Sequence, residues 1–340
     1  MSATATATAL PPEVEAPRAH IDVMAQWCKA SADSLRLQVL RVLSRDSFGV
    51  MELCSIFDIR QPALSHHLKV LANAGLVTTR REGNSIFYQR SELGQHPALE
   101  PVQQQLFASL DQIELPSAVH ERLVALHQQR EESSRSFFRD NADKFVAQQD
   151  LIASYEQYAE TVAEGLRKAP LKRSELALEV GPGDGRFLLE LAPRFERVVA
   201  VDTAAEMLEQ ARQRITDAAF NNIELLQGDT RHPDLAGLKA DCVIINMVLH
   251  HTPQPAEVIA DVAKLLADHG VVVITDLCRH DQAWAREACG DVWLGFEPED
   301  ITRWAQDAGL SDIASVYLAQ RNGFQIQVRL FGHPHTTSKD

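Results

Sequence analysis

The sequence lacks the features of a membrane or exported protein. Its strongest apolar runs, such as Val271-Val272-Val273-Ile274, are far too short to cross a bilayer. The five cysteines among 340 residues form no CxC or CxxC pair, and such an odd, scattered set is typical of reduced thiols. Residues 1–12 have neither a basic start nor a long apolar stretch, so they do not read as a signal peptide. We therefore expect a soluble, cytoplasmic protein with no membrane partner.

An overall excess of positive charge is also missing. The 47 acidic and 33 basic residues give a formal net charge of −14, which argues against broad, nonspecific binding to nucleic acid. The sign reverses locally, because residues 33–92 contain eight Lys or Arg and six Asp or Glu, a charge of +2. Electrostatic fields act over roughly a Debye length of 8–10 Å. This segment is therefore a candidate DNA-binding surface within an acidic chain.

The length and the hydrophobic pattern predict two domains, since single cores rarely grow past about 250–300 residues. We expect a disordered tail over residues 1–20, a helical domain with a hairpin over 21–92, a helical linker or dimerisation segment over 93–165, an α/β domain over 166–332 and a tail over 333–340.

The first domain shows three helical patterns followed by a hairpin. Asp33 is a plausible cap for the first of them, and Gly75 is placed to end the third. The β-prone runs 76–79 and 85–89 flank the turn 82–84. These features predict a compact helical domain that ends in a two-stranded hairpin.

The second domain alternates strands with helices, which predicts parallel strands and crossover helices. Strands are expected at 176–180, 198–201, 223–226, 242–246, 271–276, 313–318 and 324–330. The turn-rich residues 320–323 join the last two, so the last strand should be antiparallel in a seven-stranded, Rossmann-like sheet.

Polar residues on the third helix and the hairpin are suited to DNA. Short polar groups beside Leu64, Leu68 and Leu71 can reach base edges, and arginines at the hairpin can grip the backbone. The candidates are Gln61, Ser65, His66, Lys69, Arg80, Arg81, Asn84 and Arg90.

The run Ser65-His66-His67-Leu68-Lys69-x-Leu71-x-x-Ala74-Gly75-Leu76-Val77 resembles winged helix-turn-helix regulators of the ArsR family. The resemblance covers about residues 25–92. It implies that the helix through Ser65–Lys69 reads the major groove, that the hairpin is the wing, and that the protein binds double-stranded operator DNA as a homodimer.

Metal-sensing relatives carry paired cysteines near Glu52-Leu53-Cys54, whereas here Ser55 and Ile56 follow. A soft metalloid ion needs two or three convergent thiolates. We therefore interpret Cys54 as a core residue and expect no metal.

The second signature is Glu179-Val180-Gly181-Pro182-Gly183-Asp184-Gly185 between a predicted strand and a predicted helix. Glycine there permits a tight turn and a close approach of the backbone to a ligand. Asp202 ends the next strand, where ribose hydroxyls would lie. Gly228-Asp229-Thr230 follows the third strand, and Asn246 ends the fourth on the same sheet edge.

The spacing G-x-G-x-G differs from the Rossmann dinucleotide fingerprint G-x-G-x-x-G. With Gly228-Asp229 and the terminal hairpin, the residues resemble class I S-adenosylmethionine-dependent methyltransferases. The resemblance implies that S-adenosylmethionine or S-adenosylhomocysteine binds at Glu179, Gly181, Gly183, Gly185, Asp202, Thr203, Met207, Gly228, Asp229, Thr230 and Asn246.

The catalytic group is less clearly marked. His250 and His251 could act as a base, orient the loop, or hydrogen-bond to backbone. Residues 278–293, dense in Cys, His, Arg and Trp, could line an acceptor pocket or form a lid or an interface. The Asn/Asp-Pro-Pro-Tyr/Phe motif of many enzymes that methylate exocyclic or amide nitrogens is missing, which disfavours nucleic-acid methylation.

Two functions are favoured over the weaker third possibility, nucleic-acid methylation with the winged helix as a targeting arm. The first is a transcriptional regulator whose methyltransferase-like domain senses S-adenosylmethionine or S-adenosylhomocysteine, in a circuit that would suit methionine-cycle genes. The alternative is an active methyltransferase for a small-molecule acceptor, with an autoregulatory DNA-binding domain. Without paired thiols at Cys54, we favour the sensor.

Overall fold

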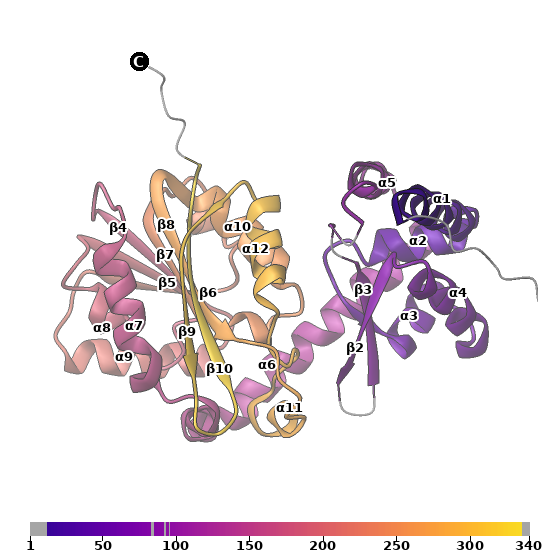
Figure 1. Ribbon diagram of the computed structural model, residues 1–340. Helices are drawn as coiled ribbons and strands as arrows, with labels where there is room; N and C mark the ends of the chain where they lie inside the picture. Colours follow the sequence, from indigo (N-terminus) through magenta and orange to yellow (C-terminus); the bar gives the residue numbers. More distant parts are fainter. Residues whose placement is uncertain (1–11, 83–84, 92, 95, 335–340) are drawn as a thin grey trace, which may run out of the picture. The chain divides into compact units, whose positions relative to one another are not determined.

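The computed structural model describes residues 12–82, 85–91, 93–94 and 96–334 (Figure 1). The chain divides into two compact units, Met1–Leu126 and His127–Asp340. One long helix, α6 (Ser117–Ile152), contributes residues to both. Within the part that the structure describes, no helix has the length and apolar character needed to cross a membrane.

The first unit combines helices with a small sheet. Its helices before α6 are α1 (Pro12–Ser31), α2 (Ser34–Val42), α3 (Val50–Phe57), α4 (Gln61–Asn73) and α5 (Glu100–Asp111). Its strands are β1 (Phe48–Gly49), β2 (Val77–Glu82) and β3 (Ser85–Arg90), in the order β1-β3-β2. The predicted order of helices and hairpin is confirmed. Strand β1 was not predicted, because two residues carry no periodicity.

Local signals in the sequence explain where these helices begin and end. The backbone N–H of Arg36 donates to Asp33 Oδ1 at 3.0 Å, which confirms the predicted cap of α2. Beyond α4, Gly75 has a φ of +68°, a conformation that glycine adopts without strain. Leu64, Leu68 and Leu71 are fully buried, so the opposite face of α4 is turned outward.

Two predicted segments differ in the structure. Helix α1 begins at Pro12, so residues 12–20 are helical rather than part of a tail. The predicted linker is divided between the two cores, because Phe107 of α5 packs in the first unit and Val162 of α7 (Tyr155–Lys168) packs in the second. Helical periodicity reveals an apolar face but not the core that covers it. The sequence therefore did not show that parts of the predicted linker, residues 93–165, belong to the two units.

A seven-stranded sheet forms the second unit, in the order β6-β5-β4-β7-β8-β10-β9. The strands are β4 (Leu176–Val180), β5 (Arg197–Asp202), β6 (Ile223–Gln227), β7 (Ala240–Asn246), β8 (Leu266–Leu277), β9 (Ser311–Ala319) and β10 (Gln325–Gly332). The pairings from β6 to β8 are parallel, whereas β10 runs antiparallel to both of its neighbours. The predicted fold class is confirmed.

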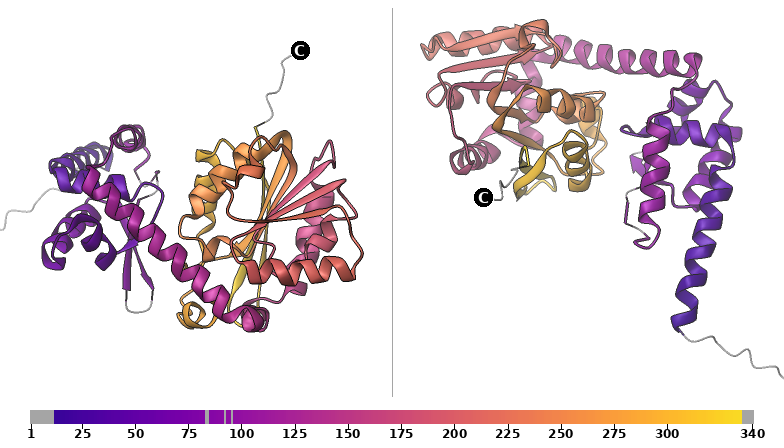
Figure 2. Two further views of the ribbon diagram at one scale, coloured as in Figure 1. Left: turned by 180° about the vertical axis from the view of Figure 1, so that it is seen from behind. Right: turned by 90° about the horizontal axis from the view of Figure 1, so that it is seen from above.

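Helices cover both faces of this sheet (Figures 1 and 2). One face carries α7, α8 (Leu188–Leu191) and α9 (Ala205–Asp217), and the other carries α10 (Pro255–Leu265) and α12 (Pro298–Asp307). A short helix, α11 (Trp284–Cys289), follows β8. Because β4, β5, β6 and β7 are parallel, the loops that follow them meet at one edge of the sheet.

Arg90, predicted to contact DNA, is instead a structural residue of the first unit. Its side chain is buried, its Nε donates to the Leu40 carbonyl at 2.6 Å, and its two terminal nitrogens donate to the Asp111 carboxylate at 3.0 and 2.7 Å. The guanidinium also lies over the Phe107 ring, 4.6 Å from its centre. Arg90 therefore ties the hairpin to α2 and α5.

We expect Arg90→Gln to loosen the first unit. Losing charge-assisted hydrogen bonds costs about 1.5–3 kcal/mol, and hydration of the partly exposed Asp111 places the expected cost near the lower value. Amide hydrogen exchange in α2 and α5 should therefore become about tenfold faster. Mass spectrometry of the whole chain measures this unit by unit.

The matched control is Lys69→Gln, which removes an exposed cation from α4 and should leave exchange unchanged. Unchanged exchange in Arg90→Gln as well would contradict the structural role of Arg90.

Candidate functional site

The glycine-rich loop after β4 is shaped by close packing. Gly181 has a φ of +64°, and a Cβ there would lie 2.6 Å from Val248 Cγ2. Its N–H donates to the Val201 carbonyl at 2.8 Å, which holds the loop against β5. A Cβ on Gly185 would lie 2.9 Å from the Ala211 Cα of α9, so Gly185 packs the loop onto a helix. It lines neither of the two cavities described next.

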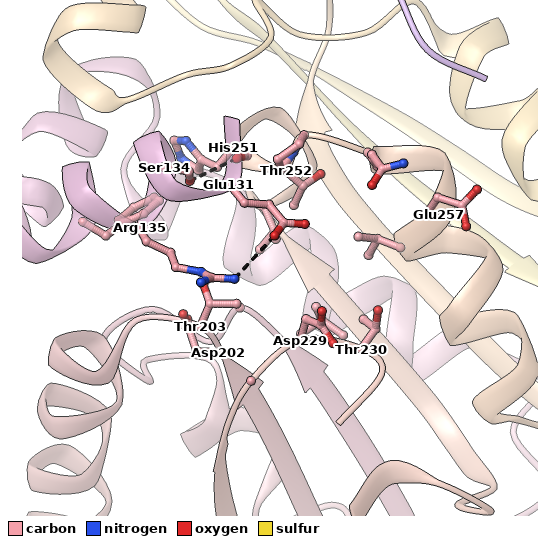
Figure 3. Close-up of a pocket in the computed structure, with 18 of the residues that line it drawn as sticks. Glu131, Ser134, Arg135, Asp202, Thr203, Asp229, Thr230, His251, Thr252 and Glu257 are labelled. Carbon is pink, nitrogen blue, oxygen red and sulfur yellow. Dashed lines mark hydrogen bonds and ion pairs between the residues drawn. The ribbon is translucent and has the colours of Figure 1, made fainter. Parts of the chain in front are cut away.

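Two adjoining cavities lie at the carboxyl edge of the sheet and share Gly181, Gly183, Met207 and Met247. The first also contains Asp202, Thr203, Gly228, Asp229 and Thr230 (Figure 3). The second contains Glu179, Asn246, Asp184, Tyr155 and Tyr158. Apart from Gly185, the structure thus brings together every residue predicted to bind the cofactor.

Carboxylates mark the first cavity. Asp202 is half-buried, and burial raises its pKa to about 6, although backbone N–H groups of Ala204, Gly183 and Thr203 oppose the rise. Asp229 is exposed, and both its oxygens are engaged by Arg231, one through the backbone N–H and one through the guanidinium at 2.8 Å. Burial works against ionisation, yet the hydrogen bonds and charge of Arg231 hold the pKa of Asp229 below its usual value.

The second cavity contains polar side chains without partners. Glu179 is 1% exposed, and its Oε2 has no hydrogen-bond partner among the described residues. Burial, together with the charges of Asp184 and Asp202, raises the pKa of Glu179 to about 8. Neither the amide nitrogen nor the amide oxygen of buried Asn246 has a partner in the described part of the chain. Buried polar groups in this condition are costly unless a ligand or water satisfies them.

Helix α6 supplies side chains that the sequence analysis missed. The first cavity is lined by Glu131, Ser134, Arg135 and Phe138. A guanidinium nitrogen of Arg135 lies 3.4 Å from Glu131 Oε2 (Figure 3). The Ser134 hydroxyl donates to the His251 carbonyl at 3.2 Å. Nothing in the sequence showed that this stretch of the predicted helical linker lies at the cavity.

The two candidate catalytic histidines have different surroundings. His251 lines the first cavity, and burial together with the neighbouring His250 holds its pKa well below the usual value. His250 is fully buried, lies outside the residues that line either cavity, and has its Nδ1 2.8 Å from Asp276 Oδ1. His251 is therefore the one placed to meet a ligand.

Residues 278–293 do not line either cavity. Cys278, Cys289 and Trp293 are buried, and the Trp293 indole donates to the Thr252 carbonyl at 2.7 Å. Burial raises the pKa of the Cys278 thiol to about 11 and that of Cys289 to about 12. Both thiols are thus protonated at neutral pH. The segment packs against the turn that carries His250 and His251, because the backbone N–H groups of Val292 and Trp293 donate to the His250 carbonyl.

In the first unit, α4 presents part of the predicted DNA surface. Gln61, His66 and Lys69 are exposed and Ser65 is half-buried. On the hairpin, Arg81 is exposed. Arg80 and Arg90 are buried, contrary to the prediction that they contact DNA. Arg80 lies over the Phe87 ring, 5.9 Å from its centre. Alternation along a strand turns neighbouring side chains to opposite faces, which separates Arg80 from Arg81. Asn84 lies outside the described residues.

Cys54 is a buried core residue, and burial raises the pKa of its thiol. This burial supports the interpretation of Cys54 as a core residue.

Comparison with known proteins agrees with this division. The family model of bacterial regulatory proteins of the arsR family matches residues 33–79, and a methyltransferase domain model matches residues 178–274. The arsenical resistance operon repressor of Staphylococcus aureus is 40% identical over 78 residues, which cover 23% of this chain and 71% of the repressor.

Other relatives match over shorter shares of their length. The trans-aconitate 2-methyltransferase of Methylobacterium radiotolerans is 34% identical over 114 residues, which cover 33% of this chain and 42% of that enzyme. The match to the biofilm growth-associated repressor of Agrobacterium fabrum spans 55% of that protein.

Among solved structures, the magnesium protoporphyrin IX methyltransferase of Synechocystis PCC 6803, with bound S-adenosylhomocysteine, superposes with a TM-score of 0.51. It is 18% identical, and the alignment covers 60% of this chain and all of that one, so the likeness concerns the fold. With the repressor relatives and the two family models, it identifies both units: the chain belongs to the ArsR family of regulatory proteins, and its second unit is a class I methyltransferase domain.

Proposed function

We propose that the protein is a transcriptional regulator that binds operator DNA through α4 and senses S-adenosylmethionine or S-adenosylhomocysteine in its second unit. The observation that carries the proposal is the pair of adjoining cavities, in which Glu179 and Asn246 have unpartnered polar atoms. As duplex half-sites are read by paired domains, the regulator acts as a homodimer.

The shape and charge of the cavities suit a nucleoside joined to an amino acid. Asp202 lies where a carboxylate can accept from ribose hydroxyls, and Asp229, whose oxygens retain lone pairs, can accept from an adenine amine. Glu179 can take the ammonium of the amino-acid end, and Asn246 can hydrogen-bond beside it. When S-adenosylmethionine is bound, its sulfonium supplies a methyl group for transfer.

Helix α6 provides a physical route from ligand to DNA. Val119 packs in the core of the first unit, and the Arg122 Nε donates to the Ile56 carbonyl at 2.7 Å. Further along the same helix, Arg135 and Phe138 line the cavity of the second unit. A ligand that changes the packing of the cavity-lining turns can bias the first unit through one continuous helix. Typical coupling energies of about 1–3 kcal/mol would change operator affinity about 5–150-fold.

A second candidate function is methyl transfer to a small acceptor. It is favoured by the position of His251, which lines the cavity and stays neutral at pH 7 because its pKa is low. A neutral imidazole can accept a proton from an acceptor as the methyl is transferred. Incubation of the protein with methyl-labelled S-adenosylmethionine and a cell extract tests this function through label transfer, and His251→Gln should reduce the rate about 10²–10⁴-fold.

The sensor proposal predicts that S-adenosylmethionine or S-adenosylhomocysteine changes operator affinity about 5–150-fold. Fluorescence anisotropy measures this with DNA selected by the purified protein from a random-sequence pool. Operator affinity that ignores both ligands would contradict the proposal.

Gly181→Ala should abolish the response, because the added Cβ would strike Val248 and the positive φ would be strained. Gly309→Ala is the matched control. Its φ of +81° is similarly unfavourable for alanine, but nothing lies within 4 Å of the added Cβ, so the response should persist.

Ligand affinity should rise between pH 7 and pH 8. The carboxyl of Glu179, with a pKa of about 8 in the free protein, is mostly protonated at pH 7, and binding an ammonium favours its ionised form. Binding therefore releases a proton, and affinity approaches a tenfold rise per pH unit before levelling above the pKa. Titration calorimetry with S-adenosylhomocysteine measures the profile.

Glu179→Gln should bind about 10–100-fold more weakly with a flattened profile. Glu224→Gln, which removes an exposed carboxylate paired with Arg197, should keep the profile of the unaltered protein. A steep pH dependence retained in Glu179→Gln would rule out Glu179 as its source.

A further inference from the structure

Three side chains converge behind the cavity, at the 3-10 turn η2 (Leu249–His251) and the loop after α11. One ligand atom from each of His250, His251 and Asp291 lies within 4.8 Å of the other two. Asp291 Oδ1 is 3.9 Å from His250 Nε2 and 3.8 Å from His251 Nδ1. All three residues are buried.

Asp291 is a buried carboxylate whose oxygens lack hydrogen-bond partners among the described residues. The residue is 4% exposed. Burial raises its pKa to about 6 and the charge of Asp276 adds to the rise, whereas His250 and the charge of Arg286 oppose it. An ionised carboxylate at such a site needs a compensating positive charge.

Asp276 orients the His250 ring so that its other nitrogen faces Asp291. The Nδ1 of His250 lies 2.8 Å from Asp276 Oδ1, and Asp276 is itself held by the backbone N–H groups of Leu249 and Leu277 at 2.9 and 2.8 Å. This leaves Nε2 facing Asp291 with no hydrogen-bond partner in the described chain. A carboxylate that fixes the far nitrogen of an imidazole is the usual support of a metal-binding histidine.

We propose that His250, His251 and Asp291 bind one divalent transition-metal cation of the Zn²⁺ class, with Asp276 as a positioning residue for His250. Two imidazoles and a carboxylate are ligands that such cations favour. Bonds of about 2.0–2.2 Å require each side chain to move inward by only a few tenths of an ångström.

A proton on His250 is the simpler source of positive charge. The imidazolium would then lie between Asp276 and Asp291, whose charges raise the pKa of His250 against the effect of burial. The separation of 3.9 Å between Nε2 and Asp291 is too long for a hydrogen bond, however, and leaves the carboxylate unsatisfied. His251 Nδ1 lies 3.4 Å from the Gly290 carbonyl and would exchange that contact for the cation. The cation would also occupy the unpartnered Nε2 of His250 and compensate the charge of Asp291.

His251 also lines the ligand cavity, so a cation held by the three protein groups would lie next to that cavity. A further coordination position on such a cation suits water or an oxygen-bearing ligand. The expectation of no metal depended on the missing second thiol beside Cys54, whereas this site is built from imidazoles and a carboxylate. The inference stands independently of the proposed function.

Equilibrium dialysis of the whole purified protein against Zn²⁺ at pH 7.5 tests the site. We expect one tightly bound equivalent in the unaltered protein and at least tenfold weaker binding in Asp291→Asn, which keeps the side-chain shape. Asp300→Asn is the matched control, since Asp300 is equally buried but pairs with Arg303 at 2.7 Å. Its Zn²⁺ binding should equal that of the unaltered protein.

Co²⁺ absorption spectroscopy of the unaltered protein provides a readout that needs no variant. Imidazole and carboxylate ligation should give intense visible bands, and His251→Gln should lose them while circular dichroism shows a folded chain. The proposal is overturned if the unaltered protein takes up no Zn²⁺, if Asp291→Asn binds it equally well, or if Co²⁺ keeps the spectrum of its aqueous ion.

Discussion

The contact between Gly181 and Val248 is the constraint on which the ligand cavities depend. The loop after β4 passes so close to the loop after β7 that a single added Cβ would lie 2.6 Å from Val248. Only glycine combines this approach with a φ of +64°. The narrow passage brings Glu179 and Asn246 to one cavity and Asp202 to the next, because parallel strands deliver their loops to a shared edge.

Helix α6 is one continuous element that contributes residues to both units. Its first turns belong to the core of the DNA-binding unit, and later turns line the ligand cavity of the methyltransferase unit. A structureless linker between the domains would provide no such continuous element. Here the same helix that lines the cavity through Arg135 also anchors the first unit through Arg122.

Much of the fold and part of the site could be predicted, and the errors have specific causes. Gly181, Gly183 and Asp202 line one cavity, and they could be grouped in advance because the motif, its strand and its spacing are local features. Arg90 was assigned to DNA because its position on the hairpin was known and its partner Asp111, 21 residues away, was not. Gly185 was grouped with the ligand-binding glycines, although its role is to pack on Ala211. His250 and His251 were treated alike, yet only His251 lines the cavity.

By itself the sequence determined the two families, the order of helices and strands, and the residues that end each strand at the ligand edge. These depend on periodicity, turn chemistry and spacing, which act over a few residues. Only the tertiary structure decided that α6 lines the cavity, that Arg80 and Arg90 are buried, and that Asp291 lies beside His250 and His251. Such relations join residues tens of positions apart, and packing brings them together without leaving a local pattern in the chain.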